Sequence, residues 1–128
     1  MYDGIENLLD TLQKQGHKLY VATSKPKEYS VRILDKFGLL KYFEYVSGSS
    51  MDEKDSDKAT IIKNALNVSL ADKKDILMIG DRCFDIKGAK TNGIDSLAVL
   101  YGYGSREEIT DSTPEYIAET VNDIFNYV

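Results

Sequence analysis

The sequence has few of the residues that build reactive or crosslinked sites. It contains one cysteine, one histidine, two prolines and no tryptophan in 128 residues. A single cysteine excludes an internal disulfide and is typical of a reducing compartment, which predicts a cytoplasmic location. No apolar run approaches the ~20 residues that span a membrane. The polar and acidic start, Met1–Glu6, predicts that there is no signal peptide.

Positive charge is also in short supply. The 16 basic residues are outnumbered by 21 acidic ones, and the net charge is −5. This balance excludes a broad basic surface and makes nucleic acid an unsuitable partner, although backbone amides and a lysine would still form a local anion site. Hydrophobic residues make up 42% and charged residues 29%, which predicts one soluble globular domain at most.

Helical and extended patterns alternate along the chain. Apolar residues at helical spacing open it, and short apolar runs, each bounded by glycine or polar residues, follow. The predicted strands cover 18–23, 42–46, 75–80, 96–100 and 116–118, and the predicted helices cover 5–12, 26–37, 58–66, 85–91, a short segment from 105 and a terminal segment to 127. Residues 47–57 are predicted to be a polar loop. The alternation predicts an α/β fold with a doubly wound parallel sheet, in which ligands bind beyond the carboxyl ends of the strands.

The stretch "DILMIGDRCFDIKGAK", residues 75–90, places acids at such an end. Asp81 follows the strand at once and Asp85 comes one helical turn later, so the pair suits a hard cation such as Mg²⁺. Taken singly, Asp81 would serve as a helix N-cap and Asp85 as a first-turn acid favoured by the helix dipole.

Two further positions offer the opposite polarity. Thr23 and Ser24 end a strand just before a helix, where a hydroxyl and backbone amides bind anions, or where a Ser or Thr simply caps the helix. Lys58 begins a helix, where a cation is unfavourable for the helix dipole, so it either has another task or is a solvated lysine. Cys83 lacks the arginine that a cysteine phosphatase needs six residues later, and His17 lies in a turn that indicates no chemistry.

Four stretches together resemble a known family: "VATSKP", "DKATIIKNAL", "MIGDRCFDIKGAKTNGID" and "VLYGYGS". They are similar to the haloacid dehalogenase-like (HAD) phosphohydrolases, most of all to the phosphoglycolate-phosphatase-like branch, over about residues 4–125. The resemblance implies a Mg²⁺-dependent phosphatase that acts on a small phosphomonoester through an aspartyl phosphate. It implies that Thr23, Ser24 and Lys58 bind the phosphoryl group, with Thr23 and Lys58 in catalysis. It also implies that Asp81 is a metal ligand, and that Asp85 is a ligand or its hydrogen-bonding partner.

The resemblance lacks one part. The family's nucleophile is an Asp-x-Asp aspartate after an N-terminal strand, and here the only such pattern, Asp55–Asp57, follows polar residues. Asp3 has no strand before it, and the cap insertion is absent. We therefore expect residues 1–128 to be a partial core domain, inactive without an upstream segment. The alternative is a non-catalytic phosphate-binding or interaction module.

The same comparison makes a structural prediction. In the family the nucleophile strand lies between the strands predicted here at 18–23 and 75–80. Because unpaired buried backbone groups cost ~1–3 kcal/mol each, the gap must be filled. We expect a strand from a partner copy or from a complementing N-terminal segment to fill it. The particular phosphoester, a phosphoglycolate-like compound or a nucleotide, stays open.

Overall fold

The structure is a computed structural model that describes residues 4–49, 57–100 and 106–128. Helices and strands alternate along most of it: α1 (Ile5–Lys14), β1 (Leu19–Pro26), α2 (Lys27–Lys36), β2 (Phe43–Ser49), α3 (Lys58–Ser69), β3 (Leu77–Gly80), α4 (Cys83–Thr91), β4 (Asp95–Val99), α5 (Arg106–Ser112) and β5 (Tyr116–Ala118). Short 3-10 helices occupy Leu40–Tyr42, Lys73–Asp75 and Asn122–Asn126. Two compact units result, one of Ile5–Leu70 and one of Ala71–Val128 with Gly4.

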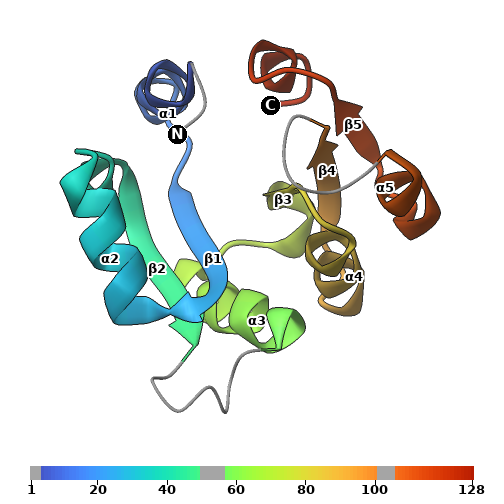
Figure 1. Ribbon diagram of the computed structural model, residues 1–128, viewed down its shortest axis with the longest axis horizontal. Coiled ribbons are helices and arrows are strands. Elements are labelled where there is room, and N and C mark those ends of the chain that lie inside the picture. The colour runs from blue at the N-terminus through green and yellow to red at the C-terminus, as the bar shows by residue number, and fades with distance from the viewer. Residues whose placement is uncertain (1–3, 50–56, 101–105) are drawn as a thin grey trace. The chain divides into compact units, whose positions relative to one another are not determined.

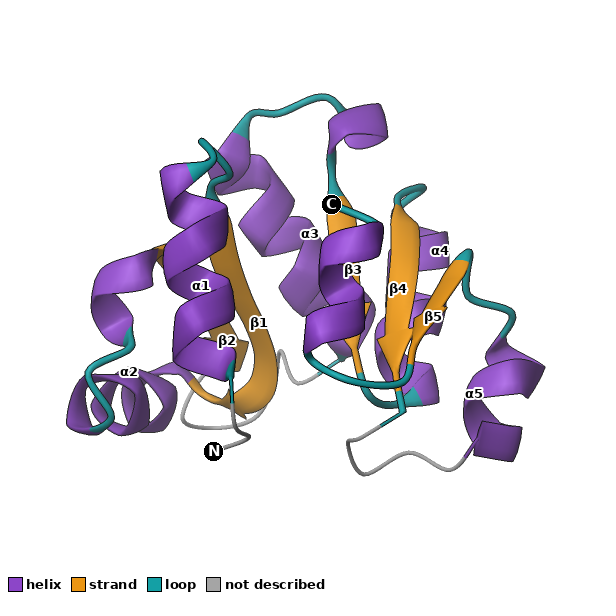
Figure 2. Ribbon diagram, turned by 90° about the horizontal axis from the view of Figure 1, so that it is seen from above, coloured by secondary structure: helices purple, strands orange, loops and turns teal. Residues whose placement is uncertain are grey.

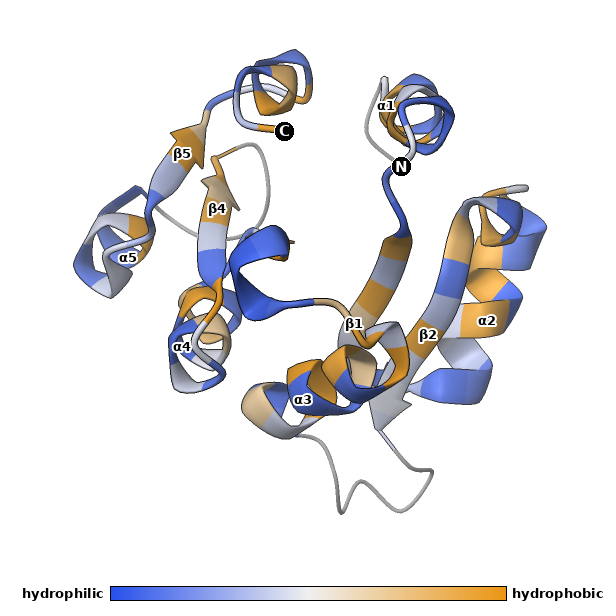
Figure 3. Ribbon diagram, turned by 180° about the vertical axis from the view of Figure 1, so that it is seen from behind, coloured by the Kyte–Doolittle hydropathy of each residue, from blue (hydrophilic) through white to orange (hydrophobic). Residues whose placement is uncertain are grey.

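The first unit is built on a parallel pair of strands, β1 and β2. Along β1, hydrophobic residues alternate with less hydrophobic ones, which is the two-residue period of side chains on a strand (Figure 3). Helices α2 and α3 both pack on this sheet, and they lie on its two sides (Figure 1). The face of α3 that is buried carries Ile61, Ile62 and Ala65.

The second unit contains a three-stranded parallel sheet in the order β3-β4-β5. The strands run side by side (Figure 2), and β4 is the central one, with four of its five residues buried. Helix α4 packs on β3 and β4, and α5 packs on α4. Ile86, Ala98 and Ile109 form a core that ties α4, β4 and α5 together. The start of α4 and the start of α5 are thereby held close to one another.

The predicted α/β class with parallel strands is confirmed, and β5 has the predicted limits, Tyr116–Ala118. Other predicted limits differ from the structure by a few residues, and three differences matter most. Strand β1 extends to Pro26, whose extended ψ of 138° postpones the helix to Lys27. Strand β2 extends to Ser49 through residues predicted as loop, because the hydroxyl of Ser47 is buried and donates to the carbonyl of Ile61 at 2.7 Å. The predicted terminal helix is a 3-10 helix over Asn122–Asn126.

Within the described strands, β1 pairs only with β2, and β3 pairs only with β4. Strands β1 and β3, which were predicted to flank the missing nucleophile strand, therefore belong to separate sheets. This is expected if the two do not pair directly with each other. The identity of the strand that completes them stays a prediction, as does the single partial domain over 1–128. Among these residues, no helix has both the length and the apolar character needed to cross a membrane.

Candidate functional site

The loop that follows β3 is organised by the second of its two acids. Asp85 is buried in the first turn of α4, and its Oδ2 accepts hydrogen bonds from the backbone amides of Asp81 at 3.1 Å and Arg82 at 3.3 Å. Helix N-termini leave such amides without partners inside the helix, and a carboxylate there also suits the helix dipole. Asp85 therefore fixes the backbone of the residue that carries the first acid.

Gly80 allows this close approach. A Cβ at position 80 would collide with the Cβ, Cγ and Oδ2 atoms of Asp85. The strand can therefore pass directly over the carboxylate only because residue 80 has no side chain. Gly80 and Asp81 at the end of the strand therefore depend structurally on Asp85, Gly80 by close approach and Asp81 by its amide hydrogen bond.

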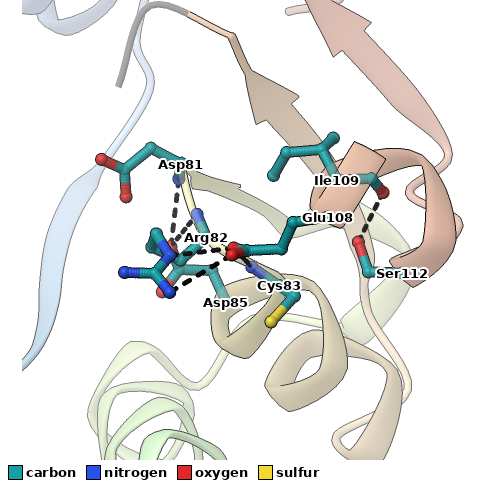
Figure 4. A network of polar contacts seen from close by, with 7 residues as sticks. All are labelled: Asp81, Arg82, Cys83, Asp85, Glu108, Ile109 and Ser112. Carbon is teal, nitrogen blue, oxygen red and sulfur yellow. Dashed lines mark hydrogen bonds and ion pairs between the residues drawn. The ribbon is translucent and has the colours of Figure 1, made fainter. Parts of the chain in front are cut away.

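A second carboxylate reaches the same loop from another helix (Figure 4). Glu108 of α5 accepts from Arg82 Nε at 2.8 Å and Arg82 Nη2 at 3.2 Å, a bidentate pair. Its Oε2 also accepts from the backbone amide of Cys83 at 2.9 Å. The Arg82 hydrogen bonds, followed by that of the Cys83 amide, lower the pKa of Glu108, and the same pairing raises the pKa of Arg82.

Two carboxylates thus bind three successive amides. Asp85 takes those of Asp81 and Arg82, and Glu108 takes that of Cys83. In Figure 4 the Asp81 side chain leaves the loop on the side away from Glu108. The backbone of the loop is therefore bound on one side while the side chain of Asp81 extends from the other.

The end of β1 carries the residues predicted to bind an anion. Thr23 Oγ1 accepts from the Lys25 amide at 3.2 Å, and Ser24 is exposed. Lys58, the first residue of α3, donates from Nζ to the carbonyl of Ala22 at 2.7 Å, one residue before Thr23. The structure therefore brings Lys58 to the predicted phosphate-binding turn, and the lysine is not a solvated side chain at a helix start.

The turn after Thr23 depends on a second close approach. A Cβ on Gly48 would lie 2.8 Å from the backbone nitrogen and Cα of Lys27 and 2.9 Å from the carbonyl oxygen of Lys25. Neither backbone has a flexible group that would move aside. The second strand can therefore lie against the turn only with glycine at this position.

The predicted residues fall into two groups, each described within its own unit. Thr23, Ser24 and Lys58 lie together at the end of β1, and Asp81 and Asp85 lie together at the end of β3. The segment Tyr101–Gly104 and residues 50–56, Asp55 included, lie outside the described residues. Asp57 is described, and its carboxylate caps α3 by accepting from the Thr60 amide at 3.2 Å.

Magnesium requires few protein ligands, since it commonly takes one or two carboxylates and completes its octahedron with water and phosphate oxygens. Within the described residues no group of three or more His, Cys, Asp or Glu side chains is arranged to hold a metal. Asp81, whose backbone is held in place, fits a magnesium site that has only one or two protein carboxylates. The resemblance left two roles open for Asp85, a metal ligand or a hydrogen-bonding partner of the ligand. Its Oδ2 accepts hydrogen bonds from two backbone amides, which fits the second role.

The comparison with protein families decides the relationship. Residues 1–99 match the family described as haloacid dehalogenase-like hydrolase. The chain belongs to the haloacid dehalogenase-like hydrolase family. This confirms the family resemblance drawn from the sequence.

Individual relatives of this HAD-family chain support the phosphatase branch. It is 37% identical over 116 residues to a 5'-nucleotidase of Pseudomonas aeruginosa, covering 91% of the chain and 52% of that protein. It is 31% identical over 127 residues to a phosphoglycolate phosphatase of Nitrosococcus oceani, covering 98% of the chain and 56% of that protein. The crystal structure of a predicted phosphatase from Clostridium acetobutylicum superposes with a TM-score of 0.95 at 42% identity, over 98% of this chain and 58% of that one. The chain thus spans about half the length of these curated relatives.

Sequence reasoning missed the part that Arg82 and Glu108 play at this site. The sequence indicates a capping box of Ser105 and Glu108 at the start of the short helix predicted from residue 105, but Ser105 lies outside the described residues. The Glu108 carboxylate binds a guanidinium and an amide that are 26 and 25 residues away in the chain. No local pattern links positions so distant, and an Arg-Glu pair has no fixed spacing that would reveal it.

Proposed function

We propose that this chain is part of a Mg²⁺-dependent HAD phosphatase that hydrolyses a small phosphomonoester. The observation that carries the proposal is the loop after β3, where Asp81 extends from a backbone held by Asp85. A carboxylate on a preorganised loop at the carboxyl end of a parallel strand suits a hard cation and its phosphate ligand. Relatives named as 5'-nucleotidase and phosphoglycolate phosphatase support a nucleotide or a phosphoglycolate-like compound as substrate.

Each residue would have a separate task. Thr23 would donate its hydroxyl to a phosphoryl oxygen, and Ser24 would donate its backbone amide. Lys58, held by the Ala22 carbonyl, would neutralise charge on the phosphoryl group. Asp81 would hold the magnesium ion, which supplies charge neutralisation when bound, and Asp85 would hold Asp81.

The nucleophile would come from an Asp-x-Asp segment that residues 1–128 do not supply. Of the one Asp-x-Asp pattern in the sequence, the described acid, Asp57, caps α3. We therefore expect the 128-residue chain to leave p-nitrophenyl phosphate unhydrolysed with Mg²⁺. Joining a family Asp-x-Asp strand and cap to its N-terminus should restore metal-dependent turnover. Turnover by the pure chain would contradict the assignment.

The completing strand would also stabilise the fold. Both β1 and β3 have a partner on one side only among the described strands. Unpaired strand edges are templates for another strand, so a second copy or an N-terminal segment would pair there. Addition of a synthetic peptide of the nucleophile strand should raise the thermal midpoint of the chain, and a scrambled peptide should not. An unchanged midpoint at saturating peptide would contradict this part of the proposal.

The second candidate function is a non-catalytic phosphate-binding or interaction module. The helix-capping role of Asp57 favours it, because this acid of the Asp-x-Asp pattern then serves structure instead of catalysis. Activity after the N-terminal addition decides between the two. A restored chain that folds and binds Mg²⁺ but does not turn over the substrate would support the module.

A further inference from the structure

Glu108 lies on α5, outside every motif that the family resemblance uses. Even so, its carboxylate makes three hydrogen bonds to the loop after β3, two to the guanidinium of Arg82 and one to the amide of Cys83. A helix start is normally capped by residues adjacent in sequence. Here α4 is capped partly by its own Asp85 and partly by an acid from another helix.

We propose that Glu108 and Arg82 are positioning residues that hold the loop carrying Asp81 in the geometry its cation requires. This inference rests on the proposed function, since the cation is the one expected at Asp81. Glu108 binds the loop from the side opposite the Asp81 carboxylate (Figure 4). It therefore restrains the loop without competing for the ligand that Asp81 would hold.

The first contribution of Glu108 is to the order of the backbone. With the Cys83 amide bound by Glu108 and the preceding two bound by Asp85, three successive amides are fixed. A ligand that binds a loop already held in place loses less conformational entropy than one that must order it. Removal of Glu108 would free the third amide and the start of α4.

The second contribution is electrostatic. Arg82 is the immediate neighbour of Asp81, and a free guanidinium would pair with that carboxylate and oppose a cation there. Bidentate pairing with Glu108 neutralises the guanidinium and fixes its direction. The guanidinium carbon also lies 5.4 Å from the centre of the Phe84 ring, so an aromatic ring is near it as well.

The chain offers a control ion pair, one partner of which lies on the same helix. Arg106 and Glu119 form an ion pair at 2.6 Å, and both side chains are 66% exposed. The Arg82 and Glu108 side chains are 43% and 26% exposed. Loss of the control pair removes the same charges without touching the Asp81 loop, so it separates a general charge effect from positioning.

The test compares Glu108→Gln and Arg82→Lys with Glu119→Gln in the 128-residue chain. Amide hydrogen exchange in the metal-free chain should become about tenfold faster at residues 81–83 in the first two variants and stay unchanged in the control. Titration with MgCl2, followed by the amide shifts of residues 80–85, should give a dissociation constant about tenfold higher in Glu108→Gln, the size of effect typical of groups that support a metal ligand. Arg82→Lys keeps the charge but loses the fork, so it should weaken binding less.

The outcomes separate this inference from the proposed function. If the parent chain shows no Mg²⁺-dependent shifts at residues 80–85, the proposed metal site is wrong, and exchange at 81–83 still decides whether Glu108 restrains the loop. If Glu108→Gln folds, and matches Glu119→Gln in both exchange and affinity, the positioning role is wrong even where Mg²⁺ binds. Dispersed spectra away from the loop confirm folding in each variant.

Discussion

Asp85 Oδ2 lies 3.1 Å from the backbone nitrogen of Asp81, so the second acid of the loop holds the first. A carboxylate that accepts hydrogen bonds from two backbone amides has an oxygen committed to structure. The two aspartates of the loop therefore differ in the folded chain. Asp81 extends outward, and Asp85 is buried beneath the loop.

Replacement of Asp85 by asparagine should destabilise the chain by about 1–3 kcal/mol, because charge-assisted hydrogen bonds to two amides become neutral ones. Urea denaturation at neutral pH measures the change. Asp111→Asn on the exposed side of α5 is the control and should stay within about 0.5 kcal/mol of the parent chain. Equal stability of the two variants would show that Asp85 does not hold the loop.

Gly80→Ala should destabilise the chain by about 1–3 kcal/mol, the range for forcing extra atoms into a packed site. The added methyl group would occupy the position of the Asp85 side chain. In the double variant Gly80→Ala/Asp85→Gly the side-chain atoms that the methyl group would meet are absent, so the two losses should be strongly non-additive in a double-mutant cycle. Additive losses would mean that the strand shifts and the added methyl group does not meet the side chain of residue 85.

Lys58→Ala should reduce turnover by about 10²-fold or more in a chain restored with its Asp-x-Asp segment, since a preorganised cation near the phosphoryl group is removed. Lys63→Ala, an exposed lysine on the same helix, is the matched control and should leave turnover unchanged. Initial rates with p-nitrophenyl phosphate and Mg²⁺ measure both. If Lys58→Ala keeps full activity, the lysine serves only to bind the Ala22 carbonyl.

The Arg82–Glu108 pair should make stability depend on pH. Hydrogen bonds from Arg82, then from the Cys83 amide, lower the pKa of Glu108 from its ordinary value of 4.5. A carboxyl with a lower pKa in the folded chain stabilises it fully above about pH 4.5, and this stabilisation is lost as pH falls through the lower folded value.

Urea midpoints of the parent chain and Glu108→Gln, measured from pH 7 down to pH 3, check this dependence. The parent chain should be the more stable at pH 7, and the difference should shrink below about pH 4.5. Glu119→Gln, which breaks an exposed pair, should show little difference across the range. A gap between Glu108→Gln and the parent chain that is constant with pH would contradict the charged pairing.

Local pattern was sufficient to predict the class of fold. Apolar runs alternating with amphipathic segments predicted parallel strands joined by helices, and the strand Tyr116–Ala118 has the predicted limits. The predicted end of a strand was wrong where small polar residues are buried, as at the end of β2. There the sequence places Ser47 in a loop, but its hydroxyl donates a hydrogen bond to the carbonyl of Ile61 on α3.

The sequence by itself determined which residues stand at the strand ends, because a strand's end and the acid after it are adjacent in the chain. Thr23 and Asp81 were identified in this way, whereas Asp85 was identified by its spacing from Asp81 and Lys58 by its place at a helix start. Only the tertiary structure decided which contacts each of them makes. Lys58 reaches the Ala22 carbonyl, and Glu108 reaches the Arg82 loop, because packing of α3 on β1 and of α5 on α4 brings distant positions within hydrogen-bond range. Such contacts depend on how whole elements pack, which no short stretch of sequence contains.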